Sequence, residues 1–167
     1  MTVFSIIPAP VAARIRLLIL DVDGVLTDGR LHFNRDGEAI KSFHAHDGQG
    51  LLYLQQAGIK LAIISRGQSD IVAQRARYLG INEVYQGCMD KRSTMQRVIE
   101  THQLSLAEVA CMGDDLPDLE MIQAAGCGIA VANAVPALKQ VADIVTQKSG
   151  GYGAVREICD QILESYE

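Results

Sequence analysis

The chain has 167 residues, of which 49% are hydrophobic and 21% are charged, and its formal net charge is −5. This length suits one globular domain that can bury a sizeable core. The Lys and Arg residues form no cluster and are outnumbered by Asp and Glu, so a nucleic-acid-binding surface is disfavoured. No apolar run approaches the ~20 residues that would span a bilayer, so no membrane partner is expected.

The N-terminal residues carry no early positive charge and include two prolines, which is unlike a secretory signal peptide. We therefore expect a cytoplasmic protein in which residues 1–14 are an N-terminal extension and residues 15–167 form a single domain. The four cysteines show no C-x-x-C spacing. This pattern favours buried free thiols over a zinc site or a disulfide framework.

Patterns typical of strands and helices alternate along the chain. Strands are expected at 15–22, 59–64, 83–85, 109–112, 127–131 and 144–145, with a hairpin at about 29–44 around the turn Asn34-Arg35-Asp36-Gly37. Helices are expected at 47–56 with Asp47 as N-cap, 69–79, 90–102, 117–125, 135–141 and 154–164. This alternation predicts an α/β fold: a Rossmann-like parallel sheet covered by helices on both faces, in three layers.

Polar side chains follow four of the predicted strands, and ligands of such sheets bind at the carboxyl ends of the strands. Carboxylates spaced i, i+2 with a glycine behind them suit Mg²⁺, which prefers oxygen ligands. The residues concerned are Asp21 and Asp23, then Ser65, then Lys91, then Asp114, Asp115 and Asp118.

Each of these residues also has a structural interpretation. The first acidic pair could be a solvated turn, and Ser65 could be a helix N-cap. Lys91 could be a solvated lysine in a first helical turn, although a cation is unfavourable there. Asp115 and Asp118 could cap the helix after Gly113.

In chain order, Asp21-Val22-Asp23-Gly24, Ser65, Lys91 and Gly113-Asp114-Asp115-x-x-Asp118 resemble the four motifs of the haloacid dehalogenase-like phosphatases, over about residues 16–157. The resemblance implies a magnesium-dependent phosphate monoesterase that forms an aspartyl-phosphate on Asp21. It implies that Asp23 transfers protons, that Ser65 and Lys91 bind the phosphate, and that Asp21, the Asp23 carbonyl and Asp114 hold Mg²⁺. Asp115 and Asp118 would then hold Lys91 and metal-bound water.

The spacing between the motifs leaves no room for a cap domain. The first gap holds only a hairpin and one helix, and the second holds only one helix and a short strand. A capless site is open to water, whose exclusion strengthens the charge interactions of such a reaction. We therefore expect neighbouring subunits to cover the site, with the hairpin as the contact.

Among capless members the chain resembles the 3-deoxy-D-manno-octulosonate (KDO) 8-phosphate phosphatases. This resemblance implies hydrolysis of KDO 8-phosphate to KDO and phosphate in lipopolysaccharide biosynthesis, by a homotetramer whose hairpins pack together. It also implies that His44, His46, Asp47, Gly48 and Arg75 face the sugar acid, with Arg66 beside Asp23 and Lys91. Arginine suits a carboxylate because it can bond it through two N–H groups. The segments that carry the resemblance are 25–29, 43–48, 79–81, 85–87 and 150–157.

Two features depart from that family, and other functions stay open. The second motif is Ser65-Arg66-Gly67, whereas the family has Ser/Thr-Gly-Arg, and His46 stands where a basic residue is common. The substrate could instead be the phosphate of a nine-carbon keto-sugar acid. A phospho-accepting receiver module also pairs acids with a hydroxyl and a lysine, but its acceptor aspartate ends the third strand, where this chain has Gln86-Gly87. A non-catalytic subunit and a metal site on His44 and His46 are further alternatives.

Overall fold

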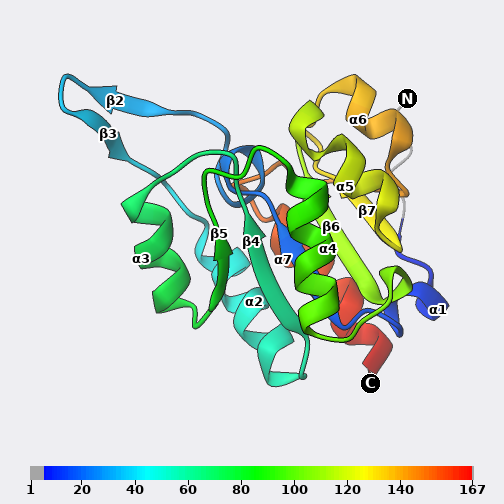
Figure 1. The fold of residues 1–167 in the computed structure, drawn as a ribbon. Helices are drawn as coiled ribbons and strands as arrows, with labels where there is room; N and C mark the ends of the chain where they lie inside the picture. Colours follow the sequence, from blue (N-terminus) through cyan, green and yellow to red (C-terminus); the bar gives the residue numbers. More distant parts are fainter. Residues whose placement is uncertain (1–5, 167) are drawn as a thin grey trace.

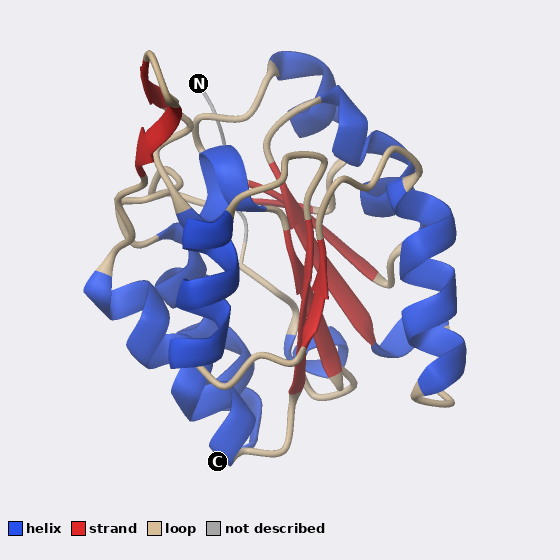
Figure 2. Cartoon of the chain, turned by 60° about the vertical axis from the view of Figure 1, so that its left-hand side comes forward, coloured by secondary structure: helices blue, strands red, loops and turns tan. Residues whose placement is uncertain are grey.

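The computed structural model describes residues 6–166 and consists of a central sheet between two layers of helices (Figures 1 and 2). The strands run in the order β5-β4-β1-β6-β7-β8, and every neighbouring pair is parallel. The parallel Rossmann-like prediction is therefore confirmed. The strands are β1 (Leu17–Leu20), β4 (Lys60–Ile64), β5 (Glu83–Tyr85), β6 (Val109–Gly113), β7 (Cys127–Ala130) and β8 (Ile144–Val145).

The central strand β1 is apolar along its whole length because it is covered on both faces. All four of its residues are fully buried, which is the pattern of a strand inside a doubly covered sheet. Helices α2 and α7 pack together, as do α4 and α5, and Figure 2 shows helices on both sides of the sheet. The helices are α1 (Ala9–Ala12), α2 (Ala45–Gln56), α3 (Asp70–Tyr78), α4 (Lys91–Thr101), α5 (Leu119–Ala124), α6 (Pro136–Val141) and α7 (Ala154–Leu163).

A hairpin of β2 (His32–Asn34) and β3 (Gly37–Ile40) projects from the body of the protein (Figure 1). It is shorter than the predicted 29–44, because the flanking residues leave the two-stranded ladder and run back to the sheet. No cap domain is inserted within residues 6–166. The hairpin is therefore the largest projection of the described chain near the carboxyl ends of the strands.

Three local predictions need correction. Helix α1 was not expected. Ile7, just before it, is buried and donates its N–H to Gln161 Oε1 (2.8 Å), so this part of the predicted extension packs on α7. Residues 1–5 lie outside the described residues. Helix α2 starts at Ala45, with His44 as its N-cap in place of Asp47. The predicted helix 117–125 begins as a 3₁₀ turn, Leu116–Asp118, before α5.

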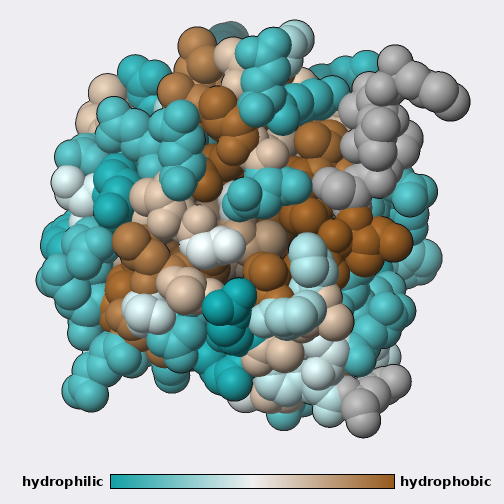
Figure 3. Space-filling model, turned by 90° about the vertical axis from the view of Figure 1, so that its right-hand side faces the viewer, coloured by the Kyte–Doolittle hydropathy of each residue, from teal (hydrophilic) through white to brown (hydrophobic). Residues whose placement is uncertain are grey.

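The polarity of the protein's surface and the state of its cysteines can be compared with the expectations from its composition. The face on the side of α6 and α1 carries apolar surface broken by polar side chains (Figure 3). No helix among residues 6–166 is both long and apolar enough to span a membrane. The four cysteines are free thiols as predicted, and three of them are buried, whereas Cys88 is half-buried.

Candidate active site

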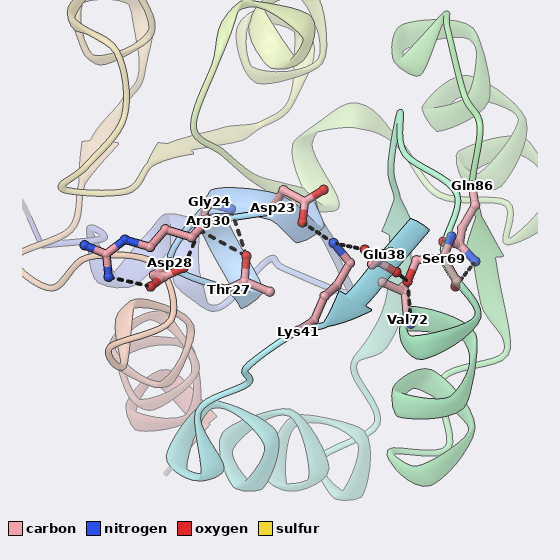
Figure 4. Close-up of polar contacts among 11 residues, drawn as sticks. Asp23, Gly24, Thr27, Asp28, Arg30, Glu38, Lys41, Ser69, Val72 and Gln86 are labelled. Carbon is pink, nitrogen blue, oxygen red and sulfur yellow. Dashed lines mark hydrogen bonds and ion pairs between the residues drawn. The ribbon is translucent and has the colours of Figure 1, made fainter. Parts of the chain in front are cut away.

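The loop that follows β1 carries Asp21 and Asp23 and depends on a glycine. Gly24 has φ of +90°, and a Cβ at this position would lie 1.9 Å from Asp114 Oδ2. Only glycine combines this left-handed backbone with so close an approach. The buried Thr27 Oγ1 accepts the N–H groups of Gly24 and Gly29, both at 3.2 Å (Figure 4). The loop is therefore held in one conformation with Asp21 beside Asp114.

A glycine turn near the C-terminus completes this loop. Gly151 N donates to Val25 O (3.1 Å). Gly150 N donates to Asn133 Oδ1 (2.7 Å), and Asn133 Nδ2 donates to Gly24 O (3.1 Å). A Cβ on Gly150 would lie 1.8 Å from that same carbonyl oxygen. Backbone from the far end of the chain thus packs directly on the first motif.

Lys91 joins two carboxylates at this edge of the sheet. It is the first residue of α4, its side chain is only 4% exposed, and its Nζ lies 2.7 Å from Asp21 Oδ1 and 2.6 Å from Asp118 Oδ1. Burial alone would lower the pKa of Lys91, but Asp21 and Asp118 raise it above its ordinary value. The lysine is therefore charged, and the carboxylates explain a cation at a helix N-terminus.

Asp118 and Asp115, which were considered together, occupy different environments. Asp118 is buried, and its Oδ2 accepts the N–H groups of Asp114 (3.0 Å) and Asp115 (3.4 Å) while its Oδ1 accepts from Lys91. Asp115 is exposed and accepts the N–H of Leu116 (2.7 Å), so it caps the 3₁₀ turn. Asp118 orients Lys91 and the loop of Asp114. Asp115 instead makes the bonds of a helix cap, which was the structural interpretation considered for it.

Asp21, Asp114 and Asp118 form a group whose oxygens lie within 4.8 Å of one another. Burial and then the neighbouring Asp21 carboxylate raise the pKa of Asp114 to about 8. Burial, followed by Asp118, raises the pKa of Asp21 to about 6. The chain thus supplies more negative charge here than Lys91 neutralises, and carboxylate oxygens suit Mg²⁺. Because both oxygens of Asp118 accept from chain donors, Asp21 and Asp114 are the better placed ligands.

Ser65 lies at the end of β4 and faces the same space. It is buried, and it is not a helix cap, because Ser69 caps α3 by accepting the N–H of Val72. One cavity of about 230 Å³ brings the predicted motifs together. Its lining includes Asp21, Asp23, Ser65, Arg66, Lys91, Asp114, Asp115 and Asp118.

The structure does not bring the other predicted substrate contacts to this cavity. His44, His46, Asp47, Gly48 and Arg75 line neither it nor the cavity beside it. Asp47 is buried and accepts the N–H of Arg156 (2.9 Å) in the first turn of α7, so the bond it makes here is a cap between two helices. Arg75 lies over the ring of Phe43 and against Gly48. The one metal-like group among residues 6–166 is the acidic one, without either histidine.

Sequence reasoning missed Glu38 and Lys41, which lie in an adjoining cavity of about 190 Å³. Both cavities are lined by Asp23 and Ser65, so they form two parts of one site. Lys41 Nζ lies 2.7 Å from Asp23 Oδ1 (Figure 4). An acid and a lysine three residues apart, leading out of a predicted hairpin next to the first motif, were the available signal.

Comparisons with known proteins agree with this geometry. A family profile described as haloacid dehalogenase-like hydrolase matches residues 76–158. A 3-deoxy-D-manno-octulosonate 8-phosphate phosphatase of Yersinia pestis is 43% identical over 152 residues, which are 91% of this chain and 81% of that protein.

Comparison with solved structures points to the same group of hydrolases. A haloacid dehalogenase superfamily (subfamily III A) hydrolase from Legionella pneumophila has a TM-score of 0.92 and 50% identity, over 94% of this chain and 86% of that one. The Moraxella catarrhalis 3-deoxy-D-manno-octulosonate 8-phosphate phosphatase, solved with magnesium, phosphate and KDO, has a TM-score of 0.91 and 42% identity, over 94% and 90%. Since relatives at this identity match nearly the whole chain, the protein belongs to the 3-deoxy-D-manno-octulosonate 8-phosphate phosphatase family of haloacid dehalogenase-like hydrolases.

Proposed function

We propose that this protein hydrolyses KDO 8-phosphate to KDO and phosphate in lipopolysaccharide biosynthesis, and that Asp21 is its nucleophile. The observation that carries the proposal is the contact of Lys91 with Asp21 at 2.7 Å, because both residues line the cavity together with Asp114. It places a charged lysine next to a carboxylate that faces open space. The relatives, including the Moraxella catarrhalis enzyme with magnesium, phosphate and KDO, support this substrate.

In the proposed reaction an Asp21 carboxylate oxygen attacks phosphorus, and the bond between phosphorus and the sugar oxygen breaks. Asp23 gives its proton to the departing alkoxide. Asp23 then takes a proton from the water that attacks the aspartyl-phosphate, so phosphate is released and both acids return to their starting states. Lys91 and the Ser65 hydroxyl offset the phosphoryl charge.

Asp21, Asp114 and the backbone carbonyl of Asp23 would hold Mg²⁺, which when bound neutralises phosphoryl charge. The fit rests on the donor set, because the carboxyl groups of Asp21 and Asp114 lie together with raised pKa values. Such a pair is stabilised when a divalent cation replaces the proton. Arg66 lines the same cavity and is the proposed contact of the sugar carboxylate in this chain.

We further propose a cytoplasmic homotetramer in which hairpins pack together and cover the open site. The hairpin region exposes apolar side chains: Leu31 is 57%, Phe33 66% and Ile40 54% exposed. Exposed apolar clusters of this kind favour protein contacts. In such an assembly His44, His46 and Arg75, which do not reach their own cavity, are candidates for contact with a neighbour's substrate. The free thiols suit a reducing compartment.

The test is phosphate release from KDO 8-phosphate with Mg²⁺, compared with the phosphates of nine-carbon keto-sugar acids. We expect the highest kcat/KM on KDO 8-phosphate. A higher value on a nine-carbon acid would reassign the substrate and keep the reaction class. Stable labelling of the protein by acetyl phosphate, without turnover of any ester, would favour the receiver function and overturn the proposal.

A further inference from the structure

The side chain of Lys41 is the starting point, because it is buried at the base of an exposed hairpin. It is 4% exposed, and its Nζ lies 2.7 Å from both Asp23 Oδ1 and Glu38 Oε1 (Figure 4). Burial acts to lower the pKa of Lys41, but hydrogen bonds to these two carboxylates raise it above the ordinary value. Removing a lysine from water requires such partners, so the contact is unlike an exposed surface ion pair.

The chain of contacts continues away from Asp23 into the body of the protein. Glu38 Oε2 accepts from Ser69 Oγ, and Ser69 is the N-cap of α3. The backbone of Ser69 is held in turn by the Gln86 side chain, whose Oε1 accepts the Ser69 N–H (2.8 Å) and whose Nε2 donates to Ser69 O (3.1 Å). Figure 4 shows these residues in one row. Lys41 is therefore fixed from both sides.

The arrangement repeats the one around the nucleophile. Lys91 lies between Asp21 and the buried acid Asp118, and Lys41 lies between Asp23 and Glu38. Each reacting carboxylate of the proposed mechanism thus has its own lysine, and each lysine has a second acid. Among the described residues, these are the lysines that line the two cavities.

The two carboxylate oxygens of Asp23 have different surroundings. Oδ1 accepts from Lys41. Oδ2 lies on the side of Ser65, because the Cβ position of Gly67 is 3.6 Å from Asp23 Oδ2 and 3.7 Å from Ser65 Oγ. A phosphate group held by the Ser65 hydroxyl would therefore lie on the Oδ2 side of Asp23. A carboxylate fixed through one oxygen presents the other in a constant direction, and such positioning determines how well an acid transfers its proton.

We infer that Lys41, anchored by Glu38, is the positioning residue of Asp23 and directs Oδ2 at the oxygen of the leaving group. The inference rests on the proposed function. It makes the hairpin part of the catalytic machinery, since Glu38 belongs to β3 and Lys41 follows it. The departing sugar alcohol needs a proton and p-nitrophenolate does not, so a misdirected Asp23 has different effects on the two kinds of ester.

The experiment compares Lys41→Met with wild type on KDO 8-phosphate and on p-nitrophenyl phosphate, in the presence of Mg²⁺. We measure kcat/KM, which reports the steps up to departure of the alcohol. Lys41→Met should lower kcat/KM by about 10- to 100-fold on KDO 8-phosphate and by less than about 3-fold on the aryl ester. Lys41→Arg should recover part of the loss, because a guanidinium can also donate to both carboxylates.

Lys60→Met is the matched control, because Lys60 is exposed at the opposite end of β4; both substrates should be unaffected. Equal losses on the two esters in Lys41→Met would overturn the inference and leave the proposed function intact. If that variant does not fold by circular dichroism, Glu38→Gln gives the same comparison, with a smaller selective loss expected and an equal loss contradicting the inference. Wild-type protein that hydrolyses neither ester would overturn the proposed function, and the inference with it.

Discussion

At the scale of single residues, the site consists of carboxylates that lie close enough to repel one another when they are ionised. Burial and then the Asp118 carboxylate raise the pKa of Asp21 and so oppose its ionised form, whereas Lys91 favours that form. A nucleophile must be ionised, and it must also not be neutralised by a tight bond to a single cation. Contact with a lysine on one side and space for a divalent cation on the other meets both needs.

Asp21→Asn removes the attacking oxygen while keeping the size of the side chain. We expect kcat on KDO 8-phosphate to fall by at least about 10³-fold, because no aspartyl-phosphate can form. The fold should be unchanged, since the amide oxygen can still accept from Lys91. Phosphate release and circular dichroism check both statements. Activity within about 10-fold of wild type would exclude Asp21 as the nucleophile.

The raised pKa values predict how Mg²⁺ and pH act on stability. Asp114 has an ordinary value of 3.8 and titrates in the folded protein at about 8. Without a cation the folded state binds a proton that the unfolded chain has lost, so this contribution to stability falls as the pH rises from about 4 to about 8. In the proposed site Mg²⁺ would bind the ionised pair of Asp21 and Asp114, so its stabilising effect should grow over the same range.

Thermal unfolding with and without Mg²⁺ tests this expectation. The rise in Tm on adding Mg²⁺ should be small at pH 5 and several degrees at pH 8, at about 2–4 °C per kcal/mol for a chain of this size. Asp114→Asn is the control and should lose most of the Mg²⁺ effect, because one ligand is gone. A rise in Tm that is the same at both pH values would contradict the assignment of the site.

At the scale of elements, Asp47 links helices α2 and α7, whereas the sequence predicted it as the N-cap of its own helix and as a substrate contact. Asp47 lies in the first turn of α2 and accepts the Arg156 N–H in the first turn of α7. A carboxylate at a helix N-terminus satisfies an unpaired N–H and interacts well with the helix dipole. The cap thus joins the two helices that pack on one face of the sheet.

We therefore expect Asp47→Ala to lower the free energy of unfolding by about 1–2 kcal/mol, which is typical for the loss of a cap. Asp47→Asn keeps an accepting oxygen and should cost less. Urea denaturation of the two variants, with the m-value checked for constancy, measures the difference. Equal losses for the two variants would mean that the charge of Asp47, and not its accepting oxygen, matters.

Local patterns determined most of the elements and the four motifs. The strand 109–112 and the acids after β1 and β6 were predicted directly, because apolar runs and strand-end polar residues are local signals. The role of Asp47 could not, since its partner is 109 positions away. The same holds for Lys41, whose burial depends on how the hairpin folds back over Asp23. Long-range pairing of polar groups leaves no periodicity in the sequence.

At the scale of the whole molecule, the site is open to water and the hairpin beside it exposes apolar side chains. The cavity with Lys41 is lined by Leu31 and Phe33, which are themselves largely exposed. A neighbouring subunit that covers these side chains would remove apolar surface from water and also shield the site. The proposed tetramer therefore addresses stability and catalysis with the same contact.

Ile40→Glu tests the assembly, because Ile40 is exposed on the hairpin and lines neither cavity. Light scattering of the wild type should give four chains, and the variant should give fewer, since a buried unpaired carboxylate is costly. Val141→Glu, on α6, is the matched control and should leave the mass unchanged. A wild-type mass of one chain, or an unchanged mass in Ile40→Glu, would contradict the hairpin contact.

The turn at Gly150 and Gly151 has a consequence for synthesis of the protein on the ribosome. All six strands of the sheet are present once residue 145 has emerged, so the sheet can form before the chain is finished. The loop with Asp21 and Asp23 gains its contacts to Asn133 and Gly151 later, when the last residues arrive. We therefore expect a nascent chain stopped before residue 150 to contain the sheet but to lack phosphatase activity, which appears only near the end of translation.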